Sequence, residues 1–272
     1  MAHQPTPSQE VNALPVTHPE NFPVASWLCP PHLRPAIAAI YAFARAADDI
    51  ADEGAQGAEQ RLSQLQSFRH ELLNGPSGHG LHADIFVPLH QVIQKFQLPV
   101  SYLNDLLKAF EQDVISSAQA MRPQSMEDIL QYCQLSANPV GRLLLHLYGV
   151  THEAALLQSD AICSALQLIN FWQDLSEDIP RGRFYVPQDL QAHLNSADLV
   201  EHLCQHAHKL MMAGAPLVHQ VPGRAGLELR GVVQGGLRVL EKVQKLGPLA
   251  FQIRPTLNAR DAPVLLWRCL WM

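Results

Sequence analysis

Apolar positions recur at helical spacing through most of the chain, and no segment alternates apolar and polar residues over the length of a strand. The spacing predicts helices over residues 33–53, 58–73, 82–97, 100–119, 126–136, 139–149, 154–178, 196–213, 216–245 and 263–271. Residues 1–20, rich in Pro, Gln, His and Thr, are expected to form a flexible tail. The number of helices and their short connections predict one all-α bundle over residues 21–272.

The first predicted helix carries one polar stripe on an otherwise apolar surface. Tyr41, Arg45, Asp48 and Asp52 lie four, three and four residues apart, which places them on one side of the helix. Such a stripe commonly faces solvent, but residues 37–47 are almost wholly apolar apart from Arg45. We therefore expect Asp48 and Asp52 to point into a polar hole inside an apolar protein.

A second acidic motif ends the predicted helix over residues 154–178. Asn170, Asp174 and Asp178 are spaced by four, so this helix too ends in an Asp-x-x-x-Asp pair. If the two helices face each other, four carboxylates line one cavity, and bare charges there would repel. Mg²⁺ is the expected counter-ion, because it takes oxygen ligands and is readily shared with substrate phosphates.

Basic residues next to the acidic motifs could bind phosphate directly. Arg45 belongs to the first stripe, and Arg181 or Arg183 follows the second motif. The rest of the cavity is expected to be lined by Ala, Ile, Leu, Phe and Trp. A diphosphate head with a long hydrocarbon tail suits this combination.

Composition narrows the possible classes of function and location. The formal charge is −6 and only 16% of the 272 residues are charged, with no basic stripe of interleaved aromatics, so nucleic-acid binding is disfavoured. Five cysteines without a C-x-x-C pair indicate free thiols in a reducing compartment and no zinc site. The N-terminal residues lack the pattern of a signal peptide, and no apolar run has the length of a membrane span. We expect a cytoplasmic protein, with peripheral contact at the inner membrane left open.

Three weaker signals have two readings each. Gly141, inside a predicted helix, indicates a close approach to the backbone, by a ligand or by another helix. The apolar segment 263–271, with Trp267 and Trp271, could dock on a membrane or pack as a core helix. His202, His206 and their neighbours resemble metal ligands but fit a polar helix face better.

Three segments resemble the squalene/phytoene synthase family of head-to-head isoprenyl diphosphate synthases over about residues 21–262. They read YAFARAADDIADE, YCQLSANPVGRLLLHLYG and NFWQDLSEDIPRGRFYVP. The resemblance implies an isoprenoid-synthase fold around a central active-site cavity. It implies that Asp48, Asp52, Asp174 and Asp178 bind Mg²⁺ and that Tyr41, Arg45 and Asn170 line the diphosphate end. It also implies substrate contacts from a further set: Phe22, Tyr132, Gly141, Phe171, Gln173, Arg183, Tyr185 and Arg260.

Within the family, two further segments most resemble the hydroxysqualene synthases of the hopanoid pathway. They are NFPVASWLCPPHLRPAIAAIYAFARAADDIADEG and LELRGVVQGGLRVLEKV. Gln173 stands where many relatives carry Arg, and Gly236 roughly where many carry Tyr near the diphosphate. Both departures disfavour the condensation of two farnesyl diphosphates. The resemblance thus implies Mg²⁺-dependent conversion of presqualene diphosphate to hydroxysqualene.

The expected chemistry is loss of diphosphate, followed by control of a carbocation in a dry pocket. Phe22, Tyr41, Phe171 and Trp172 could stabilise the cation through their ring faces, and the Gln173 amide could place the quenching water. Addition of water to the cation would give hydroxysqualene. Addition of hydride would give squalene, and loss of a proton would give a phytoene-type polyene. No dinucleotide fingerprint follows a strand, which disfavours the hydride route. The alternatives are synthesis of presqualene diphosphate, squalene, phytoene or dehydrosqualene, and a non-catalytic relative that acts as an assembly partner.

Overall fold

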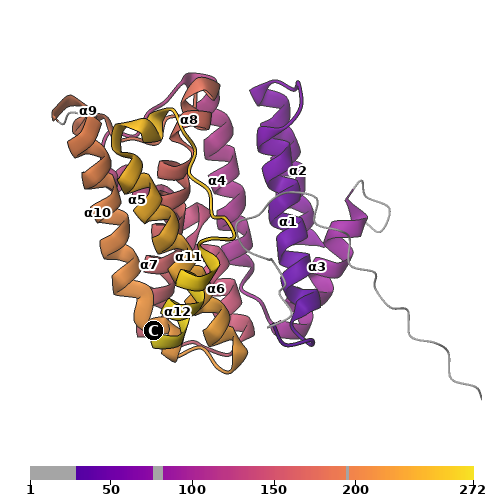
Figure 1. Ribbon diagram of the computed structural model, residues 1–272. Coiled ribbons are helices and arrows are strands. Elements are labelled where there is room, and N and C mark those ends of the chain that lie inside the picture. The colour runs from indigo at the N-terminus through magenta and orange to yellow at the C-terminus, as the bar shows by residue number, and fades with distance from the viewer. Residues whose placement is uncertain (1–28, 76–81, 194–195) are drawn as a thin grey trace, which may run out of the picture.

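The computed structural model describes residues 29–75, 82–193 and 196–272, and these residues form helices without any strand (Figure 1). The all-α prediction is confirmed. The long helices are α1 (Arg34–Asp52), α2 (Ala58–Asn74), α3 (Ala83–Phe96), α4 (Val100–Gln119), α5 (Met126–Ser136), α6 (Asn138–Leu147), α7 (Glu153–Gln173), α10 (Ser196–Gly214), α11 (Arg224–Leu246) and α12 (Ala262–Trp271). The short elements are α8 (Leu175–Asp178), α9 (Gln188–His193) and the 3₁₀ turns η1 (Ile179–Arg181), η2 (Ala215–His219) and η3 (Gly247–Phe251). The expected tail and Phe22 lie outside the described residues.

Local sequence signals explain several helix ends. Ser125 caps α5 in a reciprocal capping box, in which its hydroxyl accepts from the Asp128 backbone N–H and the Asp128 carboxylate accepts from the Ser125 N–H. Pro139 lies in the first turn of α6, where a missing N–H costs little. Gly54, with φ +87°, follows the end of α1 in a conformation that other residues rarely adopt.

Two predicted helices differ from the observed ones. The helix predicted over 154–178 is interrupted at Asp174, whose φ of −99° and ψ of 11° end α7 before α8 begins. The helix predicted over 216–245 starts later, at Arg224. Pro222 and Gly223 precede it, and Gly223 has φ +62°, which a regular helix cannot contain.

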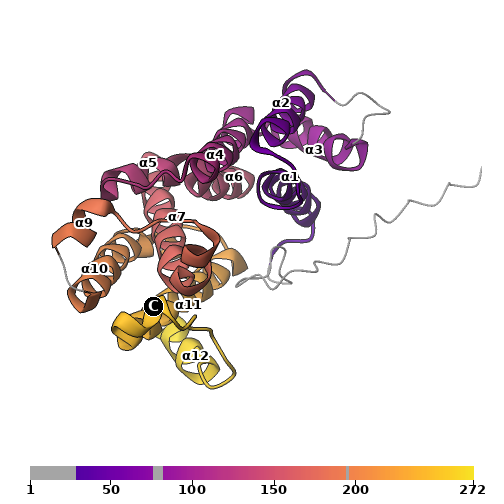
Figure 2. The ribbon, with the colours of Figure 1, turned by 90° about the horizontal axis from the view of Figure 1, so that it is seen from above.

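The hydrophobic core has two parts. One lies among α5, α7, α10 and α11 and includes the fully buried Trp172. The other lies among α1–α4 and α6, where the rings of Phe43, Phe68 and Phe86 pack together. Viewed from above, the α1–α3 group and the α10–α11 group lie on opposite sides of the molecule (Figure 2).

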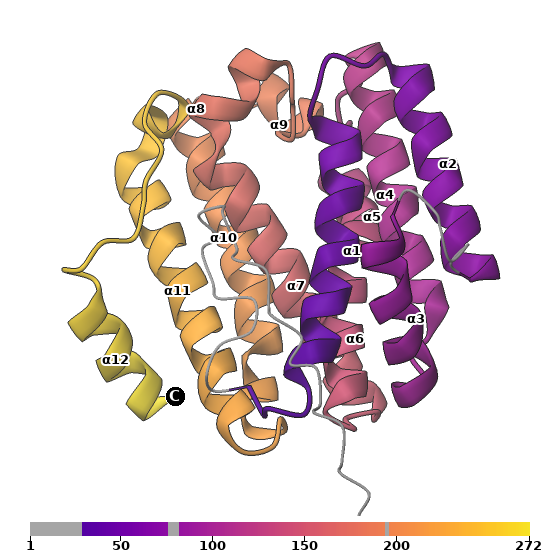
Figure 3. The same ribbon diagram turned by 90° about the vertical axis from the view of Figure 1, so that its right-hand side faces the viewer.

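The two acidic motifs come to the same end of the bundle. The C-terminal end of α1 and the short helix α8 both lie at the upper end in Figure 3. The site therefore lies where the two parts of the core meet. Among the described helices, none has the length and apolar character needed to cross a bilayer.

Candidate active site

A cavity of about 210 Å³ opens between the two parts of the core. Helices α1, α4, α5 and α7 and the segment after η1 line it, through Asp48, Asp52, Phe110, Asp113, Ser117, Tyr132, Ser136, Gln167, Arg183 and Tyr185. Most of these side chains are polar and three are acids. The expectation of a mainly apolar lining is wrong for this cavity, which suits a charged head group better than a hydrocarbon chain.

The first acidic pair enters the cavity from the last turn of α1. Arg183 Nη2 lies 2.9 Å from Asp52 Oδ2 and partly neutralises it. Burial, followed by the nearby Asp52 carboxylate, raises the pKa of Asp48 to about 6. The stripe predicted from spacing thus places two interacting carboxylates at the cavity.

The second acidic pair lies at the junction of α7 and α8. The Asp178 backbone N–H donates to the Asp174 carbonyl over 2.8 Å, so the four-residue spacing survives the break in the helix. Arg254 Nε lies 2.5 Å from Asp174 Oδ1 and 3.7 Å from Glu177 Oε1. Burial, followed by Asp174, raises the pKa of Asp178 to about 6.

Arg183 connects the two motifs electrostatically. Burial lowers its pKa, but Asp52, Tyr185 and Asp178 outweigh burial and raise it above the usual value. One guanidinium therefore feels an acid from each motif and lines the cavity as well. Of the two arginines considered after the second motif, Arg183 lines the cavity, whereas Arg181 is exposed in η1.

A third acid, Asp113 of α4, was not anticipated from the sequence as a site residue. The Tyr132 hydroxyl donates to Asp113 Oδ2 over 2.8 Å. Burial chiefly raises the pKa of Asp113 to about 7, and Asp52 and Asp48 add to the rise. The one sequence signal is the spacing of Phe110, Asp113 and Ser117 along one side of α4. Tyr132, expected to contact the substrate, lines the cavity as part of this polar group.

Aromatic side chains differ in their access to the cavity. Tyr185 lines it and stacks on Phe171, with ring centroids 3.8 Å apart and an angle of 11° between planes. Phe171 is buried behind Tyr185, and Trp172 is fully buried in the core. The prediction that Trp172 faces a carbocation is not supported by this placement.

Other residues of the predicted diphosphate end lie around the cavity instead of lining it. Arg45 contacts Asp48 at 2.8 Å, Asp49 at 2.6 Å and Glu53 at 3.1 Å, all on its own helix or just beyond it. Tyr41 is half-buried on α1 and Asn170 is exposed on α7. Gln167, three residues before Asn170, lines the cavity, although sequence reasoning did not select it.

Gln173 is buried at the end of α7, away from the cavity lining. Its side chain is only 1% exposed, and its Nε2 donates to the Pro255 carbonyl over 2.7 Å. An amide used in this way anchors the C-terminal loop to the end of α7. It does not line the cavity, so a role in placing the quenching water is not supported.

The two notable glycines belong to helix packing. A Cβ on Gly141 would collide with Ser159 and Cys163 of α7, so α6 approaches α7 closely at this point. A Cβ on Gly236 would lie 2.9 Å from Leu166 Cδ2. Of the two readings offered for Gly141, the structure supports contact between helices.

Arg260 is exposed in the loop before α12, and its backbone N–H donates to Asn258 Oδ1 over 3.0 Å. It does not line the cavity. Arg254, in the same loop, is the C-terminal basic residue that reaches an acidic motif.

The acids fit a divalent cation that arrives with a phosphate. Among the described residues, no three His, Cys, Asp or Glu side chains converge as a ready metal site. Mg²⁺ commonly uses only one or two carboxylates and takes its other oxygens from water and substrate phosphates. Burial raises the pKa values of Asp48 and Asp178, and the neighbouring acid of each pair adds to the rise, so a cation bound between the acids would favour their charged forms.

Comparison with known proteins points to one family. The family model described as squalene/phytoene synthase matches residues 16–261. A hydroxysqualene synthase of Rhodopseudomonas palustris is 32% identical over 250 residues, covering 86% of this chain and 82% of the relative.

Two solved structures share the fold. A crystal structure of squalene synthase HpnC from Alicyclobacillus acidocaldarius is 31% identical with a TM-score of 0.74, over 82% of this chain and 88% of that one. A dehydrosqualene synthase in complex with ligand has a TM-score of 0.75 at 20% identity, over 90% and 88% of the two chains. Since the family model spans most of the chain, the chain belongs to the squalene/phytoene synthase family.

Proposed function

We propose that this protein converts presqualene diphosphate to hydroxysqualene and diphosphate, with Mg²⁺ as cofactor, as a step of hopanoid and squalene biosynthesis. The observation that carries the proposal is that both acidic pairs lie at one end of the bundle, where Arg183 pairs with Asp52 and is also influenced electrostatically by Asp178. The similarity to several hydroxysqualene synthases supports the choice of substrate and product.

Arg183 and the four acids would act at the leaving group. Mg²⁺, held by Asp48, Asp52, Asp174 and Asp178, would supply positive charge to the diphosphate oxygens. Arg183 would contact the same diphosphate with its planar fork. The carbon–oxygen bond breaks, the diphosphate leaves with the electron pair, and the hydrocarbon retains the positive charge.

Asp113 and Tyr132 suit the second half of the reaction. Water adds to the rearranged cation through its oxygen and must give up a proton. The Asp113 carboxylate lines the same cavity, and a pKa of about 7 allows it to accept that proton near neutral pH. The Tyr132 hydroxyl, held on Asp113 at 2.8 Å, keeps the acceptor in place.

Product analysis tests the proposal. The purified protein with Mg²⁺ and presqualene diphosphate in H₂¹⁸O is expected to give an ¹⁸O-labelled C30 alcohol without any nicotinamide. EDTA is expected to abolish turnover. Undiminished activity in EDTA would contradict the metal assignment, and squalene formed only with NADPH would contradict the product.

Matched variants distinguish loss of a site carboxylate from loss of a surface carboxylate. Asp48→Asn and Asp178→Asn are each expected to lower kcat by about 10²-fold or more, because each removes charge from the leaving-group site. Asp105→Asn is the control, since Asp105 pairs with the exposed Lys108 at 2.8 Å. Equal effects of the three variants would overturn the assignment.

Condensation of two prenyl diphosphates is the second candidate. It is favoured by the similarity to phytoene synthases, such as one from Pantoea ananas that is 25% identical over 268 residues. Farnesyl diphosphate alone, offered in the same assay, distinguishes the two. Its efficient conversion to a C30 product would favour condensation.

A further inference from the structure

Helix α12 presents its bulkiest apolar side chains to solvent. Both of its tryptophans and two of its three leucines are exposed, with Leu266 at 68%, Trp267 at 63%, Leu270 at 75% and Trp271 at 75%. No residue of this helix is buried. We call these four residues the α12 face. The reading of residues 263–271 as a core helix is therefore wrong.

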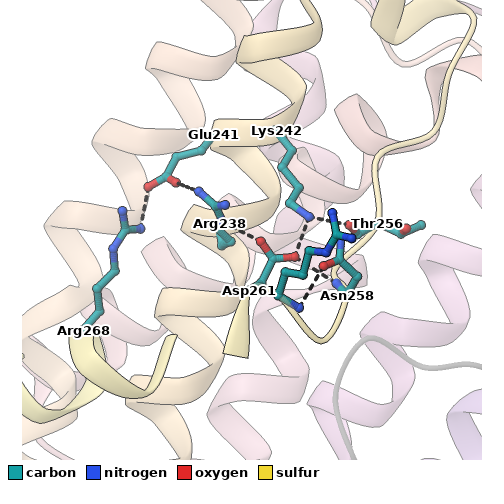
Figure 4. Close-up of polar contacts among 8 residues, drawn as sticks. Arg238, Glu241, Lys242, Thr256, Asn258, Asp261 and Arg268 are labelled. Carbon is teal, nitrogen blue, oxygen red and sulfur yellow. Dashed lines mark hydrogen bonds and ion pairs between the residues drawn. The ribbon is translucent and has the colours of Figure 1, made fainter. Parts of the chain in front are cut away.

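Polar contacts hold α12 in this orientation. Arg268 Nη1 lies 2.5 Å from Glu241 Oε1 on α11, and Glu241 Oε2 lies 2.7 Å from Arg238 (Figure 4). Arg230 Nη1 donates to the Cys269 carbonyl over 3.2 Å. The side of α12 that faces α11 is thus fixed by charged side chains, while the Trp and Leu side chains point outward.

The start of α12 is fixed more firmly still. Asp261, just before the helix, is 2% exposed and lies 2.8 Å from Arg238 and 2.5 Å from Lys242 (Figure 4). Its Oδ2 also accepts from the Asn258 backbone N–H over 2.9 Å. The helix is therefore anchored at its first turn and along its inner side, so the exposed face is a built feature of the molecule.

The charges around α12 oppose the charge of the whole chain. Five basic side chains surround α12. Arg268 lies on the helix, Arg260 lies in the loop before it, and Arg230, Arg238 and Lys242 lie on the neighbouring α11. Two acids, Glu241 and Asp261, lie among them and pair with Arg238, Lys242 and Arg268, so the basic side chains outnumber the acids and Arg230 and Arg260 stand outside these ion pairs. The chain as a whole carries −6. This corner is thus basic on an acidic protein.

We propose that the α12 face docks on the surface of an anionic lipid bilayer. Tryptophan prefers the boundary between lipid head groups and acyl chains, and the neighbouring leucines would insert beside it. The basic side chains around the face complement anionic head groups. Figure 3 shows α12 at the outer edge of the molecule, where a flat surface can reach it. A second copy fits less well, because two such basic corners would repel each other.

Flotation with vesicles tests the proposal independently of the enzymatic reaction, because no substrate is added. The full chain is expected to float with vesicles of phosphatidylglycerol and phosphatidylcholine, and less with phosphatidylcholine alone. The double variant Trp267→Ala/Trp271→Ala is expected to lose binding by about tenfold or more. A matched double variant, Leu73→Ala/Leu157→Ala, removes side chains that are 57% and 60% exposed elsewhere and should bind like wild type.

Tryptophan emission supplies a second readout that reports insertion directly. Vesicles with brominated acyl chains are expected to quench wild-type emission, and the double tryptophan variant should lose that quenching. Circular dichroism checks that both double variants remain folded. Absence of wild-type binding, or equal binding by the two double variants, would overturn the proposal. A dimer that forms without lipid and is lost in the tryptophan variant, with no vesicle binding, would assign the face to a second copy.

Discussion

At the scale of single residues, the site depends on acids whose ionisation is costly in the fold. The sequence predicted Asp48, Asp52, Asp174 and Asp178 from their spacing, because helical periodicity decides which side chains share a face. Asp113 carries no such pairing in the sequence. Its importance comes from the packing of α4 against the cavity and from Tyr132, which lies nineteen residues away in the chain.

Asp113→Asn should stabilise the metal-free and ligand-free protein at alkaline pH. The folded-state pKa of Asp113, about 7, lies above the usual 3.8, so the folded state binds the extra proton between about pH 4 and 7. Stability from this group therefore falls as pH rises through that window. We expect the gain in unfolding free energy from Asp113→Asn to be about 1–3 kcal/mol larger at pH 8 than at pH 5.

Urea unfolding of wild type, Asp113→Asn and Asp105→Asn at pH 5 and pH 8 measures this difference. Asp105→Asn should show little pH dependence of its own, because Asp105 lies in a surface pair with Lys108. If Asp113→Asn changed the unfolding free energy by the same amount at pH 5 and pH 8, that result would argue against a buried, protonated Asp113.

At the scale of secondary-structure elements, apolar periodicity predicted most of the helices, whereas the break at Asp174 and the late start of α11 were missed. Helix α11 starts eight residues later than predicted because η2 and Gly223 interrupt the pattern. In the sequence, the close contacts between helices were indicated only by glycines inside predicted helices. The identity of the helix that packs against each glycine depends on the tertiary arrangement, which cannot be predicted from the sequence of one helix alone.

Gly214→Ala is expected to lower the unfolding free energy by about 2–4 kcal/mol, as overpacking of a rigid contact does. A Cβ at this position would lie 2.5 Å from the Gln158 carbonyl oxygen and 2.9 Å from the Ile162 backbone nitrogen, and backbone atoms of α7 cannot easily move aside.

Gly231→Ala is the matched control for this substitution. Gly231 lies inside α11 with nothing within 4 Å of a Cβ, so alanine should stabilise the helix by about 0.5–1 kcal/mol. Thermal unfolding of both variants should therefore give shifts of opposite sign. Destabilisation of similar size in both would show that contact with α7 is not the cause.

At the scale of the whole molecule, two packed cores meet at a polar cavity. The cavity collects side chains from α1, α4, α5, α7 and the segment after η1, which are distant in sequence. Their assembly explains why a single ligand could stabilise both halves together. A bound ligand stabilises the folded state in proportion to the logarithm of its concentration over Kd.

Mg²⁺ and inorganic diphosphate together are therefore expected to raise the melting temperature by several degrees, and clearly more than either alone. A cation bound by the acids needs further oxygen ligands, which the diphosphate would supply, and the cation would in turn offset the charge of the diphosphate. Differential scanning fluorimetry with each ligand, with both, and with both plus EDTA measures the effect. If Mg²⁺ alone raised the melting temperature as much as Mg²⁺ and diphosphate together, the metal site would be independent of phosphate.

The loop between η3 and α12 has a practical consequence for handling the protein. Arg254 in this loop contacts Asp174, Gln173 donates to Pro255, and Asp261 at the far end contacts α11. Contacts therefore fix one end of the loop beside the second acidic motif and the other end at the start of α12 (Figure 3). Truncation before Arg254 would remove those contacts. Purification through an N-terminal tag would leave both ends of the loop in place.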